Sequence, residues 1–322
     1  MKILYLPNQY SQQRQREKKR WIYPVLLAMQ AQHYRNLGHE VYWDSKVELP
    51  GSPGDRVIKE PEQINFENLP APDRIFTKAM DPKYQRNGNF KHKPGTYIQV
   101  ADGCWHGKCT FCVEKNNQWR VRPVWDVHQE IVKIHSLGFK EVFDDSGTFP
   151  VGPWLDEFLG MENPGVVFGC NMRMVDAPWR KMKKWGFRMV LFGLESGSQK
   201  TLDRIHKGIR VQDVMHIAHA ADAGLDPHVA VMFGYPWETD KDALETLRIV
   251  HFLLKRGVVK TAQASFYTPP SGQANEGHRK YVNQIYQVAL SPQFWINKIK
   301  SIKTGDDLKY FFRQIREGIF RG

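Results

Sequence analysis

Residues 226–239 read DPHVAVMFGYPWET, and residues 241–257 continue as KDALETLRIVHFLLKRG. The first segment opens with an apolar run, 226–233, of strand length. The second has the apolar spacing of an amphipathic helix, which Gly257 ends. A loop with glycine, proline and polar residues joins the two. A strand, a loop and a helix in this order form the repeating unit of a parallel β-sheet.

The same alternation of short apolar and longer amphipathic segments recurs from Thr96 onward. Strands that alternate with helices predict a parallel sheet, either an open doubly wound layer or a full or partial barrel. In each of these architectures the active site lies at the carboxyl ends of the strands. We expect strands at 97–100, 141–143, 166–170, 189–192, 226–233 and 261–266, and helices at 124–137, 154–159, 178–185, 199–205, 211–223 and 241–256.

The regions on either side of this repeat differ from it. Residues 2–6 and 40–44 favour strands, and residues 23–37 favour a helix. Residues 48–95 are rich in Pro, Gly, Lys and Asn and predict mostly loop. The last part of the chain combines a helical pattern with basic and aromatic residues. We therefore expect a short α/β region over 1–95, a βα domain over 96–275 and a basic helical extension over 276–322.

Three of the four cysteines of the chain, Cys104, Cys109 and Cys112, lie within nine residues. Three thiolates can bind three irons of an iron–sulfur cluster and leave the last iron open to a substrate or cofactor. The alternative is a zinc site with His106 or Cys170 as its fourth ligand. Zinc loops favour paired Cys-x-x-Cys units, and this loop has one. Cys170 ends an apolar strand and suits the core better than a metal site.

Polar and glycine-rich segments follow each of the expected strands. Their repetition at one end of successive strands indicates a single convergent site. For Glu238 and Thr239 a second interpretation exists, because both stand where they can cap the helix that begins near Lys241. The segments are 104–112, 144–148, 171–173, 193–198, 234–239 and 267–272.

The chain of 322 residues is basic, with 46 Lys and Arg against 34 Asp and Glu and a net charge of +12. This charge favours a nucleic acid or an acidic metabolite as partner, and a solvated basic face is the alternative. We expect no membrane association, because no apolar run approaches the roughly 18 residues that a span requires. The start of the chain lacks the features of a secretory signal, so we expect a cytoplasmic protein.

The chain resembles the radical S-adenosylmethionine (SAM) enzymes over about residues 96–272. Three clustered cysteines with an aromatic residue, here Phe111, before the last one are the signature of this family. The segments FDDS (143–146), GLESGS (193–198), HKG (206–208) and GYPWET (234–239) resemble a subgroup whose members often carry an N-terminal cobalamin-binding domain. KILYLPN (2–8) and LGHEV (37–41) look like parts of such a domain.

Two departures from the family pattern stand out. The first two cysteines are separated by four residues instead of the usual three, and Gly107 is placed to absorb the additional residue. The N-terminal region is short and lacks an Asp-x-His-x-x-Gly cobalt-ligand motif. We therefore expect a reduced Rossmann-like region and no cobalamin. Because no cysteine follows Cys170, we also expect no second cluster.

The resemblance implies a partial (β/α)6 TIM-like barrel in which Cys104, Cys109 and Cys112 bind a [4Fe–4S] cluster. An electron from a small flavodoxin- or ferredoxin-like donor would lead to cleavage of SAM, and the resulting 5′-deoxyadenosyl radical would abstract hydrogen from a substrate. The resemblance gives the SAM contacts the following roles: Asp145 and Ser146 for the ammonium, Arg173 for the carboxylate, Glu195 and Ser196 for the ribose hydroxyls or the ammonium, Gly234 and Pro236 for the adenine by backbone approach, and Phe111 for the adenine face.

Other interpretations remain open at this stage. Glu195 and Arg173 could form a structural ion pair at the mouth of the barrel. The protein could bind nucleic acid and use the cysteines for a structural metal, which suits the charge but leaves the strand-end segments unexplained. It could also be a family member that binds cluster and cofactor without chemistry. The reaction and the substrate are not legible in the sequence.

Overall fold

The computed structural model of the protein describes residues 1–6, 23–44, 55–59, 61–62, 64–86, 89–268 and 274–316. The chain divides into two compact units, which are described separately. The first comprises Met1–Asp102, Arg120–Asp145 and Pro164–Val166, and the second comprises Gly103–Trp119, Ser146–Asn163 and Val167–Gly322.

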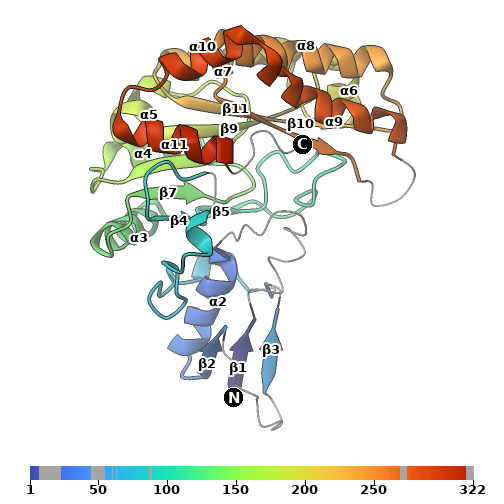
Figure 1. The fold of residues 1–322 in the computed structure, drawn as a ribbon. Helices are drawn as coiled ribbons and strands as arrows, with labels where there is room; N and C mark the ends of the chain where they lie inside the picture. Colours follow the sequence, from blue (N-terminus) through green and yellow to red (C-terminus); the bar gives the residue numbers. More distant parts are fainter. Residues whose placement is uncertain are drawn as a thin grey trace. The chain divides into compact units, whose positions relative to one another are not determined.

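The first unit begins with a small parallel sheet. Strand β1 (Lys2–Tyr5) pairs with β2 (Glu40–Trp43) on one side and with β3 (Arg56–Ile58) on the other. The helix α2 (Val25–Asn36) lies beside these strands (Figure 1). Burial of the apolar strand residues supplies the core of this layer, because apolar surface is removed from water there. Strands β1 and β2 and helix α2 match the predicted elements, whereas β3 lies in a stretch predicted as loop.

A second part of the first unit contributes to the main sheet. Strand β4 (Gly95–Ile98) pairs in parallel with β7 (Glu141–Asp144), and the helix α3 (Val124–Ser136) precedes β7 in the chain. A short antiparallel pair, β5 (Ala101–Asp102) with β6 (Arg120–Val121), lies in the same unit. Two short 3-10 helices, η1 (Phe66–Asn68) and η2 (Tyr84–Arg86), complete the described elements of this unit.

Glu130 of α3 is fully buried between two arginines in the first unit. Its carboxylate lies 2.6 Å from Arg74 and 2.6 Å from Arg122. Arg74 also donates to the carbonyl oxygen of Tyr97 on β4. Burial opposes ionisation of Glu130, but the two guanidinium groups outweigh it and lower its pKa. This buried triad joins α3 to β4 and to the segment that carries Arg74.

The second unit holds four long parallel strands, β8 (Val167–Met172), β9 (Phe187–Glu195), β10 (Asp226–Phe233) and β11 (Thr261–Phe266). Along β10 every second side chain is buried, as expected for a strand with one face toward the core. The strand order of the parallel sheet is β11-β10-β9-β8-β7-β4. The predicted partial (β/α)6 barrel is thereby confirmed.

Helices follow the strands of the second unit as predicted. Helix α8 contacts β10 and β11, and α10 packs against α8 (Figure 1). Thr239 caps α8 and pairs with Asp242 in a capping box, and Gly257 ends the helix with a φ of +72°. The helical elements are α4 (Pro153–Gly160), α5 (Trp179–Trp185), α6 (Gln199–Arg204), η3 (Val211–Val214), α7 (Met215–Asp222) and α8 (Asp240–Arg256).

The C-terminal extension is helical, as the sequence predicts. It consists of η4 (Glu276–His278), α9 (Arg279–Gln284), η5 (Ile285–Leu290), α10 (Pro292–Lys300) and α11 (Gly305–Arg316). The boundaries 1–95, 96–275 and 276–322 remain predictions as domain limits. Within the described residues, none of the helices combines the length and the apolarity that crossing a membrane demands.

Candidate functional site

The cysteine loop, residues 103–119, belongs to the second unit and begins at a glycine for a steric reason. Gly103 has a φ of +75°, and a Cβ at this position would lie 2.4 Å from the carbonyl oxygen of Gln118. The two ends of the loop therefore approach each other as only glycine permits. Gly107, in the four-residue gap, has a φ of +55°. The additional residue of the gap is thus accommodated at a position where the left-handed backbone costs little.

The cysteine loop is attached to residues 205–208, which follow α6. The N–H of Thr110 donates to the carbonyl oxygen of Ile205 at 3.0 Å, and Nε2 of His106 lies 2.7 Å from the carbonyl oxygen of His206. A Cβ on Gly208 would lie 2.6 Å from the His106 ring, so glycine leaves the space for that ring. His106, considered above as a zinc ligand, instead contacts backbone in this structure.

The three thiols differ in their exposure to solvent, and Cys104 and Cys109 affect the pKa of Cys112. Cys109 is buried, while Cys104 and Cys112 are partly exposed. Burial raises the pKa of Cys109, and the positive charges of Lys207 and Arg173 act against this rise. Burial also raises the pKa of Cys112, and its neighbours Cys109 and Cys104 add to the rise. The three sulfur atoms therefore lie within electrostatic reach of one another.

Arg173 follows β8 and places a buried cation beside the cysteine loop. Its guanidinium donates to the carbonyl oxygen of Lys207 and hydrogen-bonds Cys109. It also lies over the ring of Trp105, 5.0 Å from the ring centre. Its Nε atom is buried and has no hydrogen-bond partner within the described residues. A buried donor without a partner is one that a bound molecule can satisfy.

Glu195 ends β9 in an unusual backbone conformation, with a φ of +63°. Its carboxylate pairs with Lys207, with Oε1 and Nζ 2.8 Å apart. Both side chains are nearly buried. In the part of the chain that the structure describes, the partner of Glu195 is thus Lys207 and not Arg173. A non-glycine residue with positive φ is a strained arrangement of the kind that clusters at functional sites.

Ser146 and Ser196 are both completely buried. The carbonyl oxygen of Ser146 accepts a hydrogen bond from Asn171. The hydroxyl of Ser196 accepts the N–H of Ser198 and lies 3.3 Å from the hydroxyl of Thr246 on α8. Asp145 belongs to the first unit, where its N–H donates to the carbonyl oxygen of Ile98. The SAM-binding roles of Asp145, Ser146 and Ser196 remain predictions.

The loop after β10, residues 234–238, carries aromatic side chains toward Phe111 of the cysteine loop. The rings of Phe111 and Tyr235 lie 6.5 Å apart, and Tyr235 stacks on Trp237 at 5.5 Å. The hydroxyl of Tyr235 and Nε1 of Trp237 are buried without partners within the described residues. Burial raises the pKa of Tyr235 well above its usual value, with Glu195 and Glu238 adding to the rise, so the hydroxyl remains a donor.

Gly234 and Pro236 are both predicted to let the backbone approach an adenine. Their surroundings in the structure differ. Gly234 has a φ of +94°, and a Cβ there would lie 2.3 Å from the Phe266 ring. The Phe266 ring therefore leaves no room for a side chain at position 234. Pro236 is exposed. Glu238 does not cap α8 as considered above, because Thr239 takes that position and the Glu238 carboxylate turns back to the N–H of Gly234 at 2.7 Å.

The residues around the three thiols are compatible with an iron–sulfur cluster. Within the described ranges, no group of three or more His, Cys, Asp and Glu side chains is arranged to share one metal ion. In a cluster each thiolate binds a different iron, so the sulfur atoms need not converge on one point. Arg173 and Lys207 would offset the negative charge of cluster-bound thiolates, and the N–H of Glu114 already points to the Cys112 sulfur at 3.4 Å.

Sequence reasoning missed several residues of this site. Lys207 and Tyr235 lie in the segments HKG and GYPWET, which were noted without a role for either side chain. His106 was considered only as a zinc ligand, and Trp105 received no role. All four could have been found from their positions in the sequence. Lys207 and Tyr235 lie in conspicuous segments, and Trp105 and His106 follow the expected cluster ligand Cys104.

Comparisons with known proteins identify a domain and relatives of this chain. Residues 98–250 match the profile of the Radical SAM superfamily. A putative methylthiotransferase from Methanocaldococcus jannaschii is 31% identical over 59% of this chain and 44% of its own length. The threonylcarbamoyladenosine tRNA methylthiotransferase MtaB from Thermotoga maritima is 26% identical over 55% of this chain and 45% of its own. The chain thus spans less than half the length of these relatives.

A solved structure supports the fold. The radical SAM methyltransferase TsrM from Kitasatospora setae, with tryptophan substrate and a SAM analogue bound, superposes with a TM-score of 0.50 at 18% identity. The match covers 64% of this chain and 41% of TsrM. The three clustered cysteines, the parallel half-barrel and the profile match lead to one assignment: residues 98–250 are a radical SAM domain.

Proposed function

We propose that this chain is a radical SAM enzyme in which Cys104, Cys109 and Cys112 hold a [4Fe–4S] cluster. The observation that carries the proposal is the attachment of the cysteine loop to residues 205–208, the segment that also supplies Lys207 to Glu195. The cluster loop and the end of β9 thus meet at one segment. When bound, the cluster and SAM together supply a 5′-deoxyadenosyl radical that abstracts hydrogen from the substrate.

The residues of the chain bind and orient SAM in this proposal. Arg173 meets the SAM carboxylate, and its unpartnered Nε supports this role because a guanidinium binds carboxylates through two parallel hydrogen bonds. Lys207 holds the Glu195 carboxylate in place, so that it can accept hydrogen bonds from SAM. The remaining contacts are Asp145 and Ser146 to the ammonium, Ser196 to the ribose or the ammonium, Gly234 and Pro236 to the adenine, and Phe111 to the adenine face.

The reaction that fits the relatives is transfer of a methyl or methylthio group. Their names describe methyltransferases and methylthiotransferases, one of which acts on tRNA. The net charge of +12 supports an anionic substrate, either a nucleic acid or an acidic metabolite. The guanidinium group of Arg204 lies over the ring of Trp237, 4.9 Å from the ring centre. We propose a nucleic acid as the preferred substrate class.

Two further expectations belong to this proposal. The enzyme works without added cobalamin, because the N-terminal region carries no Asp-x-His-x-x-Gly motif. A small flavodoxin- or ferredoxin-like protein in the cytoplasm supplies the electron. Activity that appears only when cobalamin is added would contradict the first expectation.

Anaerobic reconstitution with iron and sulfide tests the enzyme assignment. We expect about four irons per chain and release of 5′-deoxyadenosine that depends on SAM and a reductant. Replacing Cys104, Cys109 and Cys112 together by Ala should remove both the bound iron and the release of 5′-deoxyadenosine. Replacing Cys170, a buried residue of β8, by Ala should leave both. Stoichiometric zinc without an iron chromophore would overturn the proposal.

Binding measurements test the substrate class. Fluorescence anisotropy with bulk tRNA should show binding that weakens steeply between low and physiological salt, as counterion release requires. A mixture of mononucleotides at the same phosphate concentration is the control. Equal binding of both would favour a small acidic substrate.

A further inference from the structure

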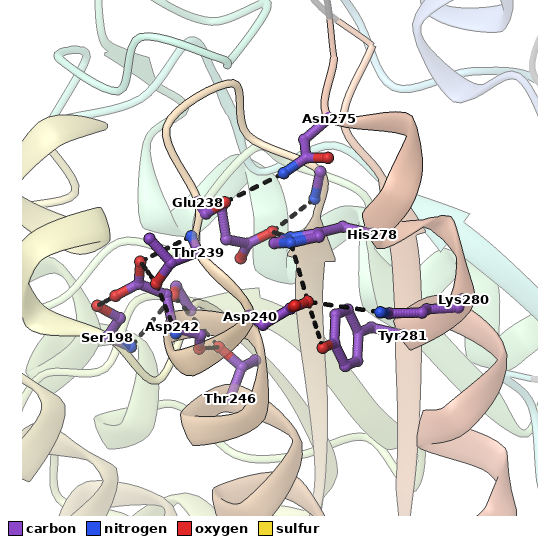
Figure 2. Close-up of polar contacts among 12 residues, drawn as sticks. Ser198, Glu238, Thr239, Asp240, Asp242, Thr246, Asn275, His278, Lys280 and Tyr281 are labelled. Atoms are coloured by element: carbon purple, nitrogen blue, oxygen red, sulfur yellow. Dashed lines mark hydrogen bonds and ion pairs between the residues drawn. The ribbon is translucent and has the colours of Figure 1, made fainter.

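We propose that residues 275–278, here called the C-terminal segment, belong to the functional site, and that His278 is a positioning residue for the loop 234–238. The proposal rests on the proposed function in that this loop borders the SAM site. Figure 2 shows the C-terminal segment reaching Glu238 and the start of α8. The role of this segment was not legible in the sequence.

Asn275 binds the backbone at both ends of the loop. Its N–H donates to the carbonyl oxygen of Gly234 at 2.9 Å, and its side-chain amide donates to the carbonyl oxygen of Glu238 at 3.1 Å. A single residue therefore bridges the first and last residues of the loop. Such a bridge fixes the separation of the loop ends without any contact to the aromatic side chains between them.

Glu238 connects His278 directly to the loop backbone. One carboxylate oxygen, Oε2, accepts the N–H of Gly234 at 2.7 Å and lies 2.9 Å from Nδ1 of His278. The Glu238 side chain is completely buried and that of His278 is nearly so. In its Nδ1–H tautomer, His278 donates a hydrogen bond to this oxygen. A shift of His278 moves the carboxylate that holds Gly234.

A second arm of the same network reaches solvent and is weaker. Asp240 lies 3.4 Å from Nε2 of His278 and accepts a hydrogen bond from Tyr281 at 2.6 Å. Its side chain is 65% exposed, so water screens these contacts. The bond from His278 to Glu238 is sheltered from water and is the one that positions the loop.

The loop presents polar atoms that have nothing to bind within the described residues. The Tyr235 hydroxyl, the Trp237 Nε1 atom and the Oε1 atom of Glu238 are all buried without partners. Buried polar atoms are nearly always hydrogen-bonded in native proteins. Three exceptions within four residues indicate a loop shaped for a ligand, and the C-terminal segment holds the backbone from which they project.

Hydrogen exchange on the cluster-free protein tests the positioning role directly. His278→Phe removes the donor to Glu238, and amides of residues 234–239 should exchange about tenfold faster, as expected for loss of a hydrogen bond to a buried charged group. His278→Asn offers an amide donor at the position of Nδ1 and should restore exchange to within about twofold of the natural protein. Tyr281→Phe breaks only the Asp240 arm and is the matched control.

The reconstituted enzyme supplies the second readout. His278→Phe should raise the KM for SAM about tenfold with a smaller effect on kcat, and His278→Asn should recover most of the loss. Unchanged exchange and unchanged KM in His278→Phe would overturn the proposal. Asn275→Ala, which removes the amide bond to Glu238, replaces His278→Phe if that variant does not fold. If the natural protein does not cleave SAM, the proposed function fails, whereas the exchange data still decide the role of His278.

Discussion

Lys207 Nζ lies 2.8 Å from Glu195 Oε1, and the side chains of both residues are about nine-tenths buried. Removing one partner of a buried ion pair leaves the other charge without compensation. A Cβ at Gly193 would lie 2.5 Å from that Glu195 oxygen and 2.9 Å from Nζ. The pair therefore occupies space that only glycine at 193 leaves open.

We expect Lys207→Met to lower the free energy of unfolding by about 3 kcal/mol, because Glu195 is then buried without a counter-charge. The double variant Glu195→Gln with Lys207→Met should recover part of that loss. Urea unfolding of the two single variants and the double variant measures the coupling. Additive effects in this cycle would show that the two charges do not stabilise each other.

The contact of His106 with His206 predicts how firmly the cysteine loop retains a cluster. His106→Ala removes the bond to the His206 carbonyl, so iron should pass to a chelator about fivefold faster from the reconstituted protein. Lys108→Ala changes an exposed residue of the same loop and is the control. Equal rates for all three proteins would contradict a role for His106 in holding the loop.

The buried triad of the first unit predicts a large loss of stability. Glu130→Ala leaves Arg74 and Arg122 as uncompensated charges in the core, and we expect a loss of about 3–5 kcal/mol. Thermal unfolding followed by circular dichroism measures it. Asp73→Ala, which breaks the more exposed pair with Arg35, should have a much smaller effect. A loss below that of Asp73→Ala would contradict the importance of the triad.

His228 on β10 predicts a dependence of stability on pH. Burial, with a smaller effect from Lys298, lowers the pKa of His228 to about 4 from its usual 6.5. Unfolding therefore takes up a proton between these values, so the stability present above pH 6.5 is lost as the pH falls toward 4. The loss is about 3 kcal/mol, at about 1.4 kcal/mol for each pKa unit.

Unfolding measured at several pH values checks this expectation. His228→Gln cannot take up the proton and should show a flatter profile over the same range. His219→Gln, at an exposed position of α7, should keep the steep profile of the natural protein. Identical slopes in all three proteins would show that His228 is not the group responsible.

The elements of the fold could be predicted because their signals are local. The strand 226–233 matches β10 residue for residue, and Gly257 ends α8 as its place in the sequence indicates. The cysteines were visible for the same reason, since their spacing is short. Strand β3 was missed because it has only three residues, too few to show a periodicity of their own.

The pairings inside the site could not be predicted, because they join residues that are distant in the chain. Glu238 and His278 are 40 positions apart, and His106 and His206 are 100 positions apart. Sequence alone made Arg173 as plausible a partner for Glu195 as any other cation. Lys207 is the ion-pair partner of Glu195 because the loop after α6 packs against the end of β9. Only the folded chain contains that information.

Residues 205–208 form only a short turn, yet four parts of the site depend on them: Thr110, His106, Arg173 and Glu195. Three of these contacts use backbone carbonyl groups and one uses the Lys207 side chain. This arrangement constrains how the protein can evolve. Insertions or deletions in the turn would displace the cysteine loop and the end of β9 together. In homologous chains its length should therefore stay fixed, and changes at 106, 195 and 207 should occur jointly.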